Sequence, residues 1–565
     1  MEAPSQRKQI VLSGWAAALM ASASFIPTAA QAAQPHCIDL AAQLLTNSDI
    51  LPGATSVKIS SPGILSYCQV NITVSDLAGP ENGYQPGQKQ MINVGIGLPL
   101  NATDGGSGGV VGNWNGRIED LGGGGYAGSV GSVTGATNAG YVGSSTDTGH
   151  TGFDGKFALN PDKTLNWGLI QDFAYNGIHA QAVWSKKLVQ MYYGQTQKYT
   201  YWNGCSTGGR QGHQQAQKYP NDYDGILAGA PAFNWDRFIP SEQYGQIVMN
   251  QELGAPISTA KLNAVTNAAI QACDPLDGIT DGVIQDPRAC SFSARQSFVC
   301  LANGGSSTDP NCMTAAEASA VDKIWQGPPN QGQGQQLWFG LERGAPLTSL
   351  DGSPPFFIST NWLAYWVHQD PTFDWHTLTE TTFNDDFYAS EIKFHDVIGT
   401  DDPDLSQFQQ AGGKMIMYHG LADQLIMPRG SYNYYNAATQ RSGGLNHVQD
   451  FYRFFPYPGN NHCAGSNVKA PLINGVDLFN ALVNWVENGV APDYIVAYNG
   501  PNHTGVSRKI CKYPDATVFN GNGSTSDENS FTCQPQTHDP LQNAEQALPD
   551  KGANNGNGQL TNLNK

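Results

Sequence analysis

KYTYWNGCSTGGRQGHQQAQKYP, residues 198–220, is the stretch on which the prediction of the fold depends. Its first part is rich in aromatic and β-branched residues and predicts a strand, and its last part predicts a helix that ends at Pro220. Between them, Gly204-Cys205-Ser206-Thr207-Gly208 predicts a sharp, glycine-flanked turn. A strand, a turn and a helix in this order are the setting in which a G-x-S-x-G motif presents a nucleophilic serine. Ser206 is therefore the candidate nucleophile.

Two further candidate catalytic residues follow predicted strands later in the chain. Asp423 comes after the buried-type strand at residues 414–418, and His462 ends the β-like run FYRFFPYPGNNH. Serine, aspartate and histidine in this order are typical of an α/β-hydrolase, in which loops at the carboxyl edge of the sheet hold the functional groups. His462 would take the hydroxyl proton of Ser206, and Asp423 would fix the imidazole tautomer. We therefore predict the α/β class, with an α/β-hydrolase core.

The acid and the histidine both have rivals in the sequence. The placement of Asp423 directly after a strand favours it over the acids that precede the strand, and His462 differs from the rival histidines in lying next to a cysteine. The rivals are Asp401, Asp402, Asp404, His419 and His447.

The cysteines support the pairing of Ser206 with His462. Cys205 directly precedes the serine and Cys463 directly follows the histidine, so a disulfide between them would bring both catalytic groups together. The chain has 10 cysteines, and proximity along the sequence pairs the other eight, which leaves Cys205–Cys463. The alternative is that some of them are free buried thiols. The eight pair as Cys37–Cys68, Cys273–Cys290, Cys300–Cys312 and Cys511–Cys533.

Export would explain this use of cysteine. Residues 1–32 predict a secretory signal, with Arg7 and Lys8 before an apolar, alanine-rich run and a small-residue cleavage site that ends at Ala32. The alternative is an uncleaved membrane anchor, which the shortness of the apolar run disfavours. An even number of cysteines in an exported chain favours disulfides. We therefore expect a secreted or periplasmic protein.

The length and charge of the chain restrict its organisation and partners. A chain of 565 residues with a net charge of −18 is expected to form two or three units and to bind neither nucleic acid nor an anionic membrane surface. Its oligomeric state stays open. We expect a catalytic domain at 33–234 and 405–533, a lid domain at 235–404 and a disordered, Asn-, Gln- and Gly-rich tail at 534–565. Aromatic residues of the lid are mostly expected in its core, although as a group they could line a pocket.

Catalysis also needs donors for the developing oxyanion. The backbone N–H of Thr207, just after the nucleophile, is one predicted donor. The second is expected from the run Gly122 to Gly125, and Gly123 is the chosen residue.

Four aspartates crowd the segment between Cys273 and Cys290. Carboxylates at short spacing, with glycines between them, suit Ca²⁺ in a structural role, although the spacing is not that of an EF-hand. The alternative is a solvated acidic turn. The aspartates are Asp274, Asp277, Asp281 and Asp286, and the carbonyls of Ile279 and Val283 could complete the shell.

Four motifs together resemble those of the tannase and feruloyl esterase family: GCSTGGRQG, YDGILAGAPA, HGLAD and NHC. The resemblance extends from about Cys37 to Cys533. It implies an inserted lid, a disulfide beside the catalytic serine and histidine, and hydrolysis of small esters of aromatic acids, either galloyl, feruloyl or other hydroxycinnamoyl esters or the terephthalate monoester cleaved by the related MHETase. It also implies Ca²⁺ in the lid, and the implied ligands are the side chains of Asp274, Asp277 and Asp281 and the carbonyls of Ile279 and Val283.

The chain departs from the MHETase pattern at two positions. Thr207 stands where such enzymes carry Glu, and Ile426 stands where they carry Phe, which argues against efficient hydrolysis of terephthalate monoesters. A serine peptidase that uses the same triad would also fit the motifs, and so would a catalytically silent protein that binds aromatic ligands. The leading prediction is a secreted carboxylesterase for esters of aromatic acids.

Overall fold

A computed structural model describes residues 34–536, apart from residues 52, 54, 76–87, 89, 110 and 332–334. The predicted signal at residues 1–32 lies outside the described residues, and so does the predicted tail from residue 537 onward. Within the described ranges, no helix combines the length and the apolar character that crossing a bilayer requires.

The described chain is organised around one mixed nine-stranded sheet in the order β1-β2-β3-β5-β4-β6-β7-β8-β9. Neighbours from β5 through β9 run parallel, and β1, β2, β3 and β5 pair antiparallel. The order confirms the predicted α/β class. The strands are β1 (Ser56–Ser60), β2 (Tyr67–Val74), β3 (Ile92–Pro99), β4 (Arg117–Leu121), β5 (Val142–Thr146), β6 (Tyr199–Cys205), β7 (Gly225–Gly229), β8 (Lys414–Gly420) and β9 (Tyr452–Tyr457).

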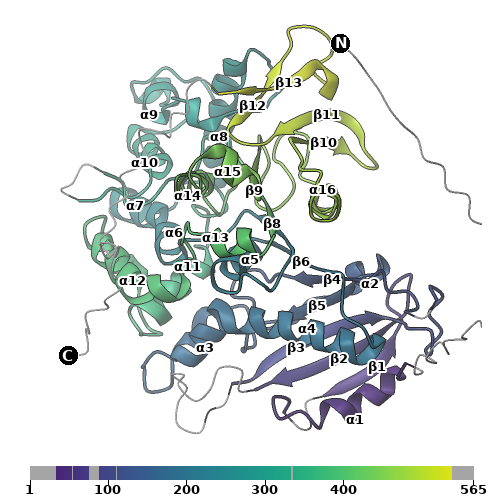
Figure 1. The fold of residues 1–565 in the computed structure, drawn as a ribbon. Helices are drawn as coiled ribbons and strands as arrows, with labels where there is room; N and C mark the ends of the chain where they lie inside the picture. Colours follow the sequence, from purple (N-terminus) through teal and green to yellow (C-terminus); the bar gives the residue numbers. More distant parts are fainter. Residues whose placement is uncertain are drawn as a thin grey trace, which may run out of the picture.

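Helices cover both faces of the parallel strands (Figure 1). Side chains alternate between the faces along a strand, so Trp202 of β6 packs toward one set of helices and Tyr201 toward the other. The Trp202 face lies against α4, α5 and α14, and the Tyr201 face lies against Leu482 and Trp485 of α16. The helices are α4 (Gly177–Tyr193), α5 (Thr207–Lys218), α14 (Pro428–Arg441) and α16 (Gly475–Asn488).

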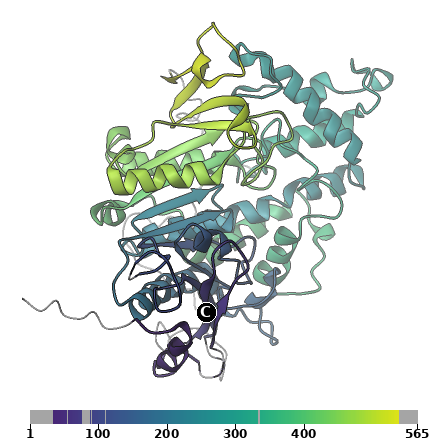
Figure 2. The same cartoon turned by 90° about the vertical axis from the view of Figure 1, so that its right-hand side faces the viewer.

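A long insertion separates β7 from β8 and is mainly helical, with no regular strand among its described residues. Its aromatic residues pack into one large core with Tyr126 and Phe173, which precede β6 in the chain. Figure 2 shows the insertion in teal along one side of the sheet. Its helices are α6 (Trp235–Ser241), α7 (Tyr244–Leu253), α8 (Thr259–Cys273), α9 (Ala294–Ser297), α10 (Ala315–Gln326), α11 (Phe357–Asn361), α12 (Thr382–Ile398) and α13 (Ser406–Gln410).

Two antiparallel hairpins follow α16, near β9 and opposite the edge formed by β1 (Figures 1 and 2). Cys511–Cys533 joins them. The second hairpin extends to Pro535, so regular structure continues two residues into the segment from 534 that we expected to be disordered. The hairpins are β10 (Tyr494–Gly500) with β11 (Thr504–Cys511), and β12 (Asp515–Phe519) with β13 (Phe531–Pro535). Shorter helices elsewhere in the chain are α1 (Leu40–Leu44), α2 (Thr134–Asn138), α3 (Trp167–Gln171) and α15 (Leu445–Gln449).

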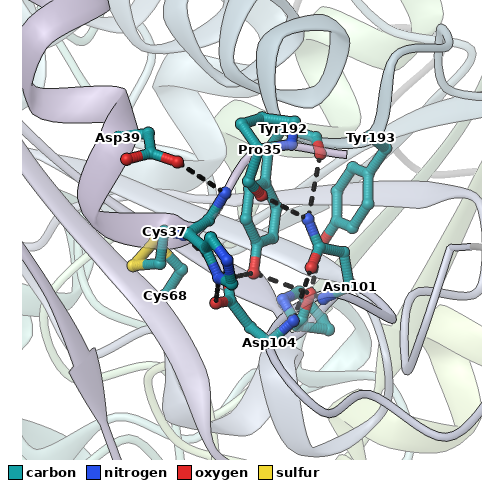
Figure 3. The surroundings of a disulfide bond; sticks show 10 residues. Pro35, Cys37, Asp39, Cys68, Asn101, Asp104, Tyr192 and Tyr193 are labelled. Carbon is teal, nitrogen blue, oxygen red and sulfur yellow. Dashed lines mark hydrogen bonds and ion pairs between the residues drawn. A yellow bond between two sulfur atoms is a disulfide. The ribbon is translucent and has the colours of Figure 1, made fainter. Parts of the chain in front are cut away.

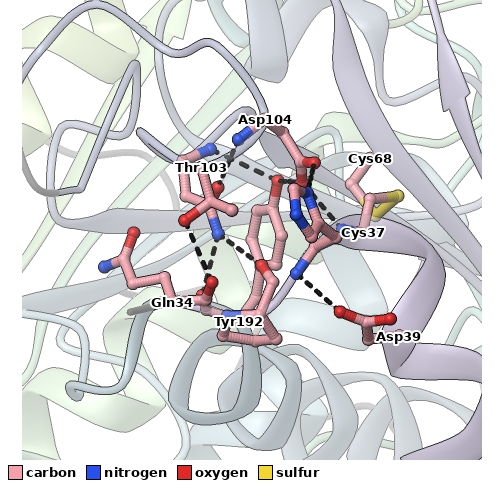
Figure 4. Close-up of polar contacts among 10 residues, drawn as sticks. Gln34, Cys37, Asp39, Cys68, Thr103, Asp104 and Tyr192 are labelled. Atoms are coloured by element: carbon pink, nitrogen blue, oxygen red, sulfur yellow. Dashed lines mark hydrogen bonds and ion pairs between the residues drawn. A yellow bond between two sulfur atoms is a disulfide. The ribbon is translucent and has the colours of Figure 1, made fainter. Parts of the chain in front are cut away.

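A polar cluster fixes the first described residues to the end of α4. The carboxylate of Asp104 accepts the backbone N–H of Cys37 at 2.7 Å and the hydroxyl of Tyr192 at 2.6 Å (Figure 3). The Thr103 hydroxyl donates to the carbonyl of Gln34 at 2.9 Å (Figure 4). Because Cys37 is also bonded to Cys68 of β2, these contacts attach the amino-terminal segment to the antiparallel edge of the sheet.

Candidate active site

Ser206 occupies the turn between β6 and α5, as the sequence predicts. Its backbone has φ 65° and ψ −124°, a sparsely populated conformation for a residue with a side chain, which indicates a strained turn. The flanking glycines allow the turn because a Cβ on Gly204 would lie 2.6 Å from the carbonyl oxygen of Gly208. The Ser206 N–H donates to the carbonyl of Gly229 at 2.9 Å, which ties the turn to the end of β7.

The disulfide between Cys205 and Cys463 joins the end of β6 to the loop that follows the non-adjacent strand β9. The Cα atoms of the pair are 5.8 Å apart although 258 positions separate them in sequence. His462 is therefore held beside Ser206, as the cysteine positions indicate. All five predicted disulfides are present in the structure.

Asp423 lies in the loop after β8 and orients His462. Its side chain is fully buried, and its Oδ2 lies 2.8 Å from Nδ1 of His462. The backbone N–H groups of Leu425 and Ile426 donate to Oδ1 at 2.8 and 2.9 Å. Burial opposes ionisation, but the charge of His462 and the hydrogen bonds outweigh it and hold the pKa of Asp423 below its usual range. The carboxylate is thus well suited to stabilise an imidazolium.

The rival residues occupy other places. His419 is fully buried, with Nε2 at 3.0 Å from the same Oδ2 and Nδ1 at 2.7 Å from the Ser431 hydroxyl, and it does not line the cavity at Ser206. It therefore positions the acid and does not compete with His462. The remaining rivals make separate contacts: Asp404 pairs with Arg441, Asp401 lies 3.6 Å from His395, Asp402 caps the turn to Asp404, and His447 is exposed.

A cavity of about 510 Å³ opens above the turn that carries Ser206. One side, here called the catalytic wall, consists of Cys205, Ser206, Thr207, His462 and Cys463. The other side, the insertion wall, comes from the segment between β7 and β8 and consists of Trp235, Phe238, Ile239, Glu242, Phe356 and Ile358. The glycine run 122–125, Ala232, Leu425 and Ile426 complete the lining. A mostly apolar cavity of this size accommodates an aromatic group.

Ser206 and His462 share the catalytic wall without a direct hydrogen bond. Among the described residues, Oγ of Ser206 has no hydrogen-bond partner. Such contacts are often long in the ligand-free state and tighten when substrate binds.

The predicted oxyanion donors have different surroundings. Thr207 begins α5, and its hydroxyl donates to the carbonyl of Gly125 at 2.6 Å, which holds the glycine loop against the helix. The N–H of Gly123 donates to Oε1 of Gln211 at 2.9 Å, so this amide is engaged in the described conformation. Gly123 as an oxyanion donor stays a prediction, and it requires Gln211 to give up this bond.

Glu242 is a cavity residue that none of the sequence motifs singles out. It is the residue directly after α6, and it follows Trp235, Phe238 and Ile239 at the spacing i, i+3, i+4 and i+7, which continues one face of the helix. Its exposed fraction is 3%, and its Oε2 has no hydrogen-bond partner among the described residues. A glutamate in an otherwise apolar helical stripe was the signal that could have identified it.

The predicted calcium ligands lie together but serve other partners in the described conformation. Asp274 accepts the backbone N–H groups of Asp281 and Gly282 at 3.1 and 2.9 Å, and Asp281 also pairs with Arg508 at 2.8 Å. Within the described residues, no group of three or more His, Cys, Asp or Glu side chains is arranged to hold a metal. The oxygen atoms of these residues nevertheless suit Ca²⁺ chemically. Burial, together with the negative charges of Asp281 and Asp274, raises the pKa of Asp277. Calcium stays a prediction.

A parallel sheet with a serine in the turn after β6, and an aspartate–histidine pair in the later loops, defines an α/β-hydrolase. The family model for tannase and feruloyl esterase matches residues 110–534. The chain belongs to this family and thus to the carboxylic ester hydrolases.

Individual relatives agree with the family assignment. A "Probable feruloyl esterase" of Arthroderma benhamiae is 36% identical over 492 residues, which cover 83% of this chain and 86% of the relative. The crystal structure of feruloyl esterase B from Aspergillus oryzae superimposes with a TM-score of 0.76 at 27% identity, and the match covers 88% of this chain and 99% of that one. A tannin acyl hydrolase from Aspergillus niger, with a TM-score of 0.72 and 24% identity over 86% of this chain and 91% of its own, shares the fold.

Proposed function

We propose that the chain is a secreted serine carboxylesterase that hydrolyses feruloyl, other hydroxycinnamoyl or galloyl esters. The observation that carries the proposal is the joining of Ser206 to His462 through Cys205–Cys463 on the wall of an apolar cavity. The names of the relatives support the substrate class, and five disulfides support an oxidising compartment.

The proposed reaction has two halves. Oγ of Ser206 attacks the ester carbonyl carbon while Nε2 of His462 takes the hydroxyl proton, and Asp423 stabilises the resulting imidazolium. The tetrahedral intermediate collapses, the proton passes to the leaving alcohol, and the aromatic acyl group stays on the serine. A water molecule then gives its proton to His462 and attacks the acyl-enzyme, which releases the acid and restores Ser206.

The rival functions predict different outcomes in the same assays. A hydrolase of terephthalate monoesters has less support, because two positions differ from the related enzymes. Thr207 stands in place of their Glu and donates its hydroxyl to Gly125, and Ile426 stands in place of their Phe in the lining of the cavity. A peptidase would cleave casein. A silent binding protein would retain an aromatic ligand but would not react with a fluorophosphonate.

The test combines covalent labelling with a substrate panel. A fluorophosphonate probe should label the wild type and the exposed-loop control Ser132→Ala, and it should not label Ser206→Ala. Methyl ferulate, methyl gallate and chlorogenate should be hydrolysed faster than the terephthalate monoester, and casein should stay intact. Labelling that persists in Ser206→Ala would refute the assignment of the nucleophile.

Structural calcium is a second part of the proposal, supported by the oxygen donors of the 274–283 segment. Added Ca²⁺ should raise the Tm of the chelated protein and leave the initial rate nearly unchanged, because the segment does not line the cavity. Asp277→Asn should abolish the Tm increase. Asp286→Asn should not, because Arg288 already binds Asp286 through two contacts of 2.8 and 2.9 Å. A wild-type Tm that does not change when Ca²⁺ is added would contradict the proposal.

A further inference from the structure

The cavity contains one acidic side chain whose role the proposed reaction does not explain. Glu242 lines the insertion wall, and its side chain is almost completely buried. A buried carboxyl oxygen without a partner is costly, since the group loses its bonds to water and gains none in the protein. Such a group in a binding cavity is expected to find its partner in the ligand.

The surroundings of Glu242 favour its neutral form. Burial, and then the negative charge of Asp423, raise the pKa of Glu242 well above its usual range. A neutral carboxylic acid has one O–H donor and a carbonyl acceptor. A phenolic hydroxyl also donates and accepts, so the two groups can pair in either direction.

Glu242 directly follows α6, a helix that begins close to Ser206. Ala232, just before α6, donates its N–H to the carbonyl of Ser206 at 3.1 Å, so the helix starts beside the nucleophile. The seven helical steps from Trp235 to Glu242 then span roughly 10 Å at 1.5 Å per residue. Because these side chains line the same cavity as Ser206, the aromatic ring of an acyl group bound at Ser206 would lie against them and within reach of Glu242.

A second polar atom lies on the same stripe. The indole N–H of Trp235 is buried and has no hydrogen-bond partner among the described residues. The insertion wall thus contains two buried polar groups without a hydrogen-bond partner among the described residues, surrounded by Phe and Ile side chains. An acyl ring without polar substituents would leave both groups unpaired.

We propose that Glu242 is a specificity-determining residue that hydrogen-bonds a hydroxyl substituent on the aromatic acyl ring of the ester. The inference rests on the proposed function, because it takes the cavity at Ser206 to be the ester-binding site. It predicts a preference for ring-hydroxylated acyl groups over the same acyl groups without the hydroxyl.

The experiment compares methyl 4-hydroxycinnamate with methyl cinnamate, which differ only by the ring hydroxyl. The wild type should favour the hydroxylated ester by about 10- to 100-fold in kcat/KM, the size expected for one hydrogen bond at a buried site. Glu242→Met should remove most of this preference by losing activity mainly on the hydroxylated ester. Glu242→Gln should keep part of it, because the amide also donates and accepts.

Asp351→Asn is the matched control, because Asp351 is also a buried acid with an unpartnered oxygen but does not line the cavity. It should change stability and keep the wild-type ratio of the two esters. A Glu242→Met enzyme with the wild-type ratio, or with equal losses on both esters, would overturn the proposal. If Glu242→Met does not fold, the test uses the wild type and Glu242→Gln instead. A wild-type ratio of kcat/KM for the two esters near one would then overturn the proposal.

The outcomes separate this inference from the proposed function. Hydrolysis of both esters at equal kcat/KM would refute the role of Glu242 and leave the esterase in place. Failure to hydrolyse either ester, together with no fluorophosphonate labelling of Ser206, would refute the proposed function itself.

Discussion

The two walls of the cavity are held in different ways. On the catalytic wall, a disulfide fixes Cys205 to Cys463, and a hydrogen bond of 2.8 Å fixes His462 to the buried Asp423. The insertion wall consists of side chains from α6, its C-cap residue Glu242 and the start of α11, which are held mainly by packing, and it includes the unpartnered Oε2 of Glu242. Under the proposed function, reactivity would therefore depend on the disulfide and a few hydrogen bonds, whereas selectivity would depend on the shape and polarity of a packed surface.

The acid of the catalytic wall provides the strongest test of this comparison. Asp423→Asn should lower kcat about 10³- to 10⁴-fold on every ester, because the amide holds the wrong tautomer of His462. His419→Gln should cost far less, because the imidazole at 3.0 Å only positions the carboxylate. Steady-state kinetics on methyl ferulate and phenyl acetate measure both losses. A loss confined to one ester would show that the catalytic wall also selects the substrate.

The disulfide provides the next test. Cys205→Ala combined with Cys463→Ala should lower kcat about 10-fold or more and should also lower the Tm, because the closed loop is long. The control removes Cys300–Cys312, which closes only a short loop of the insertion. That control should lower the Tm with little change in kcat. A double variant with full kcat would show that hydrogen bonds alone align Ser206 with His462.

Substitutions in the insertion wall should change the selectivity between ester substrates. Phe238→Ala removes an aromatic side chain from the cavity and should weaken kcat/KM for methyl ferulate about 10-fold, while phenyl acetate, with its small acyl group, is affected less. Ile392→Ala, an exposed position on α12, is the control and should change neither ester. Equal losses on both esters after Phe238→Ala would remove the distinction between the walls.

The smallest effect concerns the stability of the insertion. His395 of α12 lies 3.1 Å from the buried Asp236 of α6. Burial lowers the pKa of His395, but the bond to Asp236 and the charge of Asp401 outweigh it and raise the pKa to about 9. A folded-state pKa above the unfolded value of about 6.5 adds stability below pH 6.5, and this stability disappears as the pH rises through 9.

Urea unfolding at several pH values measures this effect. Between pH 6.5 and pH 9, the wild type should lose about 1–3 kcal/mol of unfolding free energy relative to His395→Gln. The exposed His376 offers a control, and His376→Gln should follow the wild-type pH dependence. Parallel curves for the wild type and His395→Gln would show that the ion pair adds no stability.

The sequence predicted the catalytic side better than the insertion side, for physical reasons. The strand before Ser206, the helix after it and the cysteine pairing follow from local patterns and from spacing. The pairing of β1, β2 and β3 with the parallel strands depends on contacts between distant segments, and the hairpins β10–β13 were not predicted. The hydrogen bond from Gly123 to Gln211 and the burial of Glu242 depend on tertiary packing, which cannot be read from one amino-acid sequence.

The cross-link between Cys205 and Cys463 has a consequence for how such enzymes can diversify. The whole segment between β7 and β8 lies within the loop that this bond closes. Exchange or enlargement of that segment would therefore leave the proposed nucleophile linked to its proposed proton acceptor. The architecture is modular: a transplanted insertion could bring a new substrate range to an unchanged reaction centre.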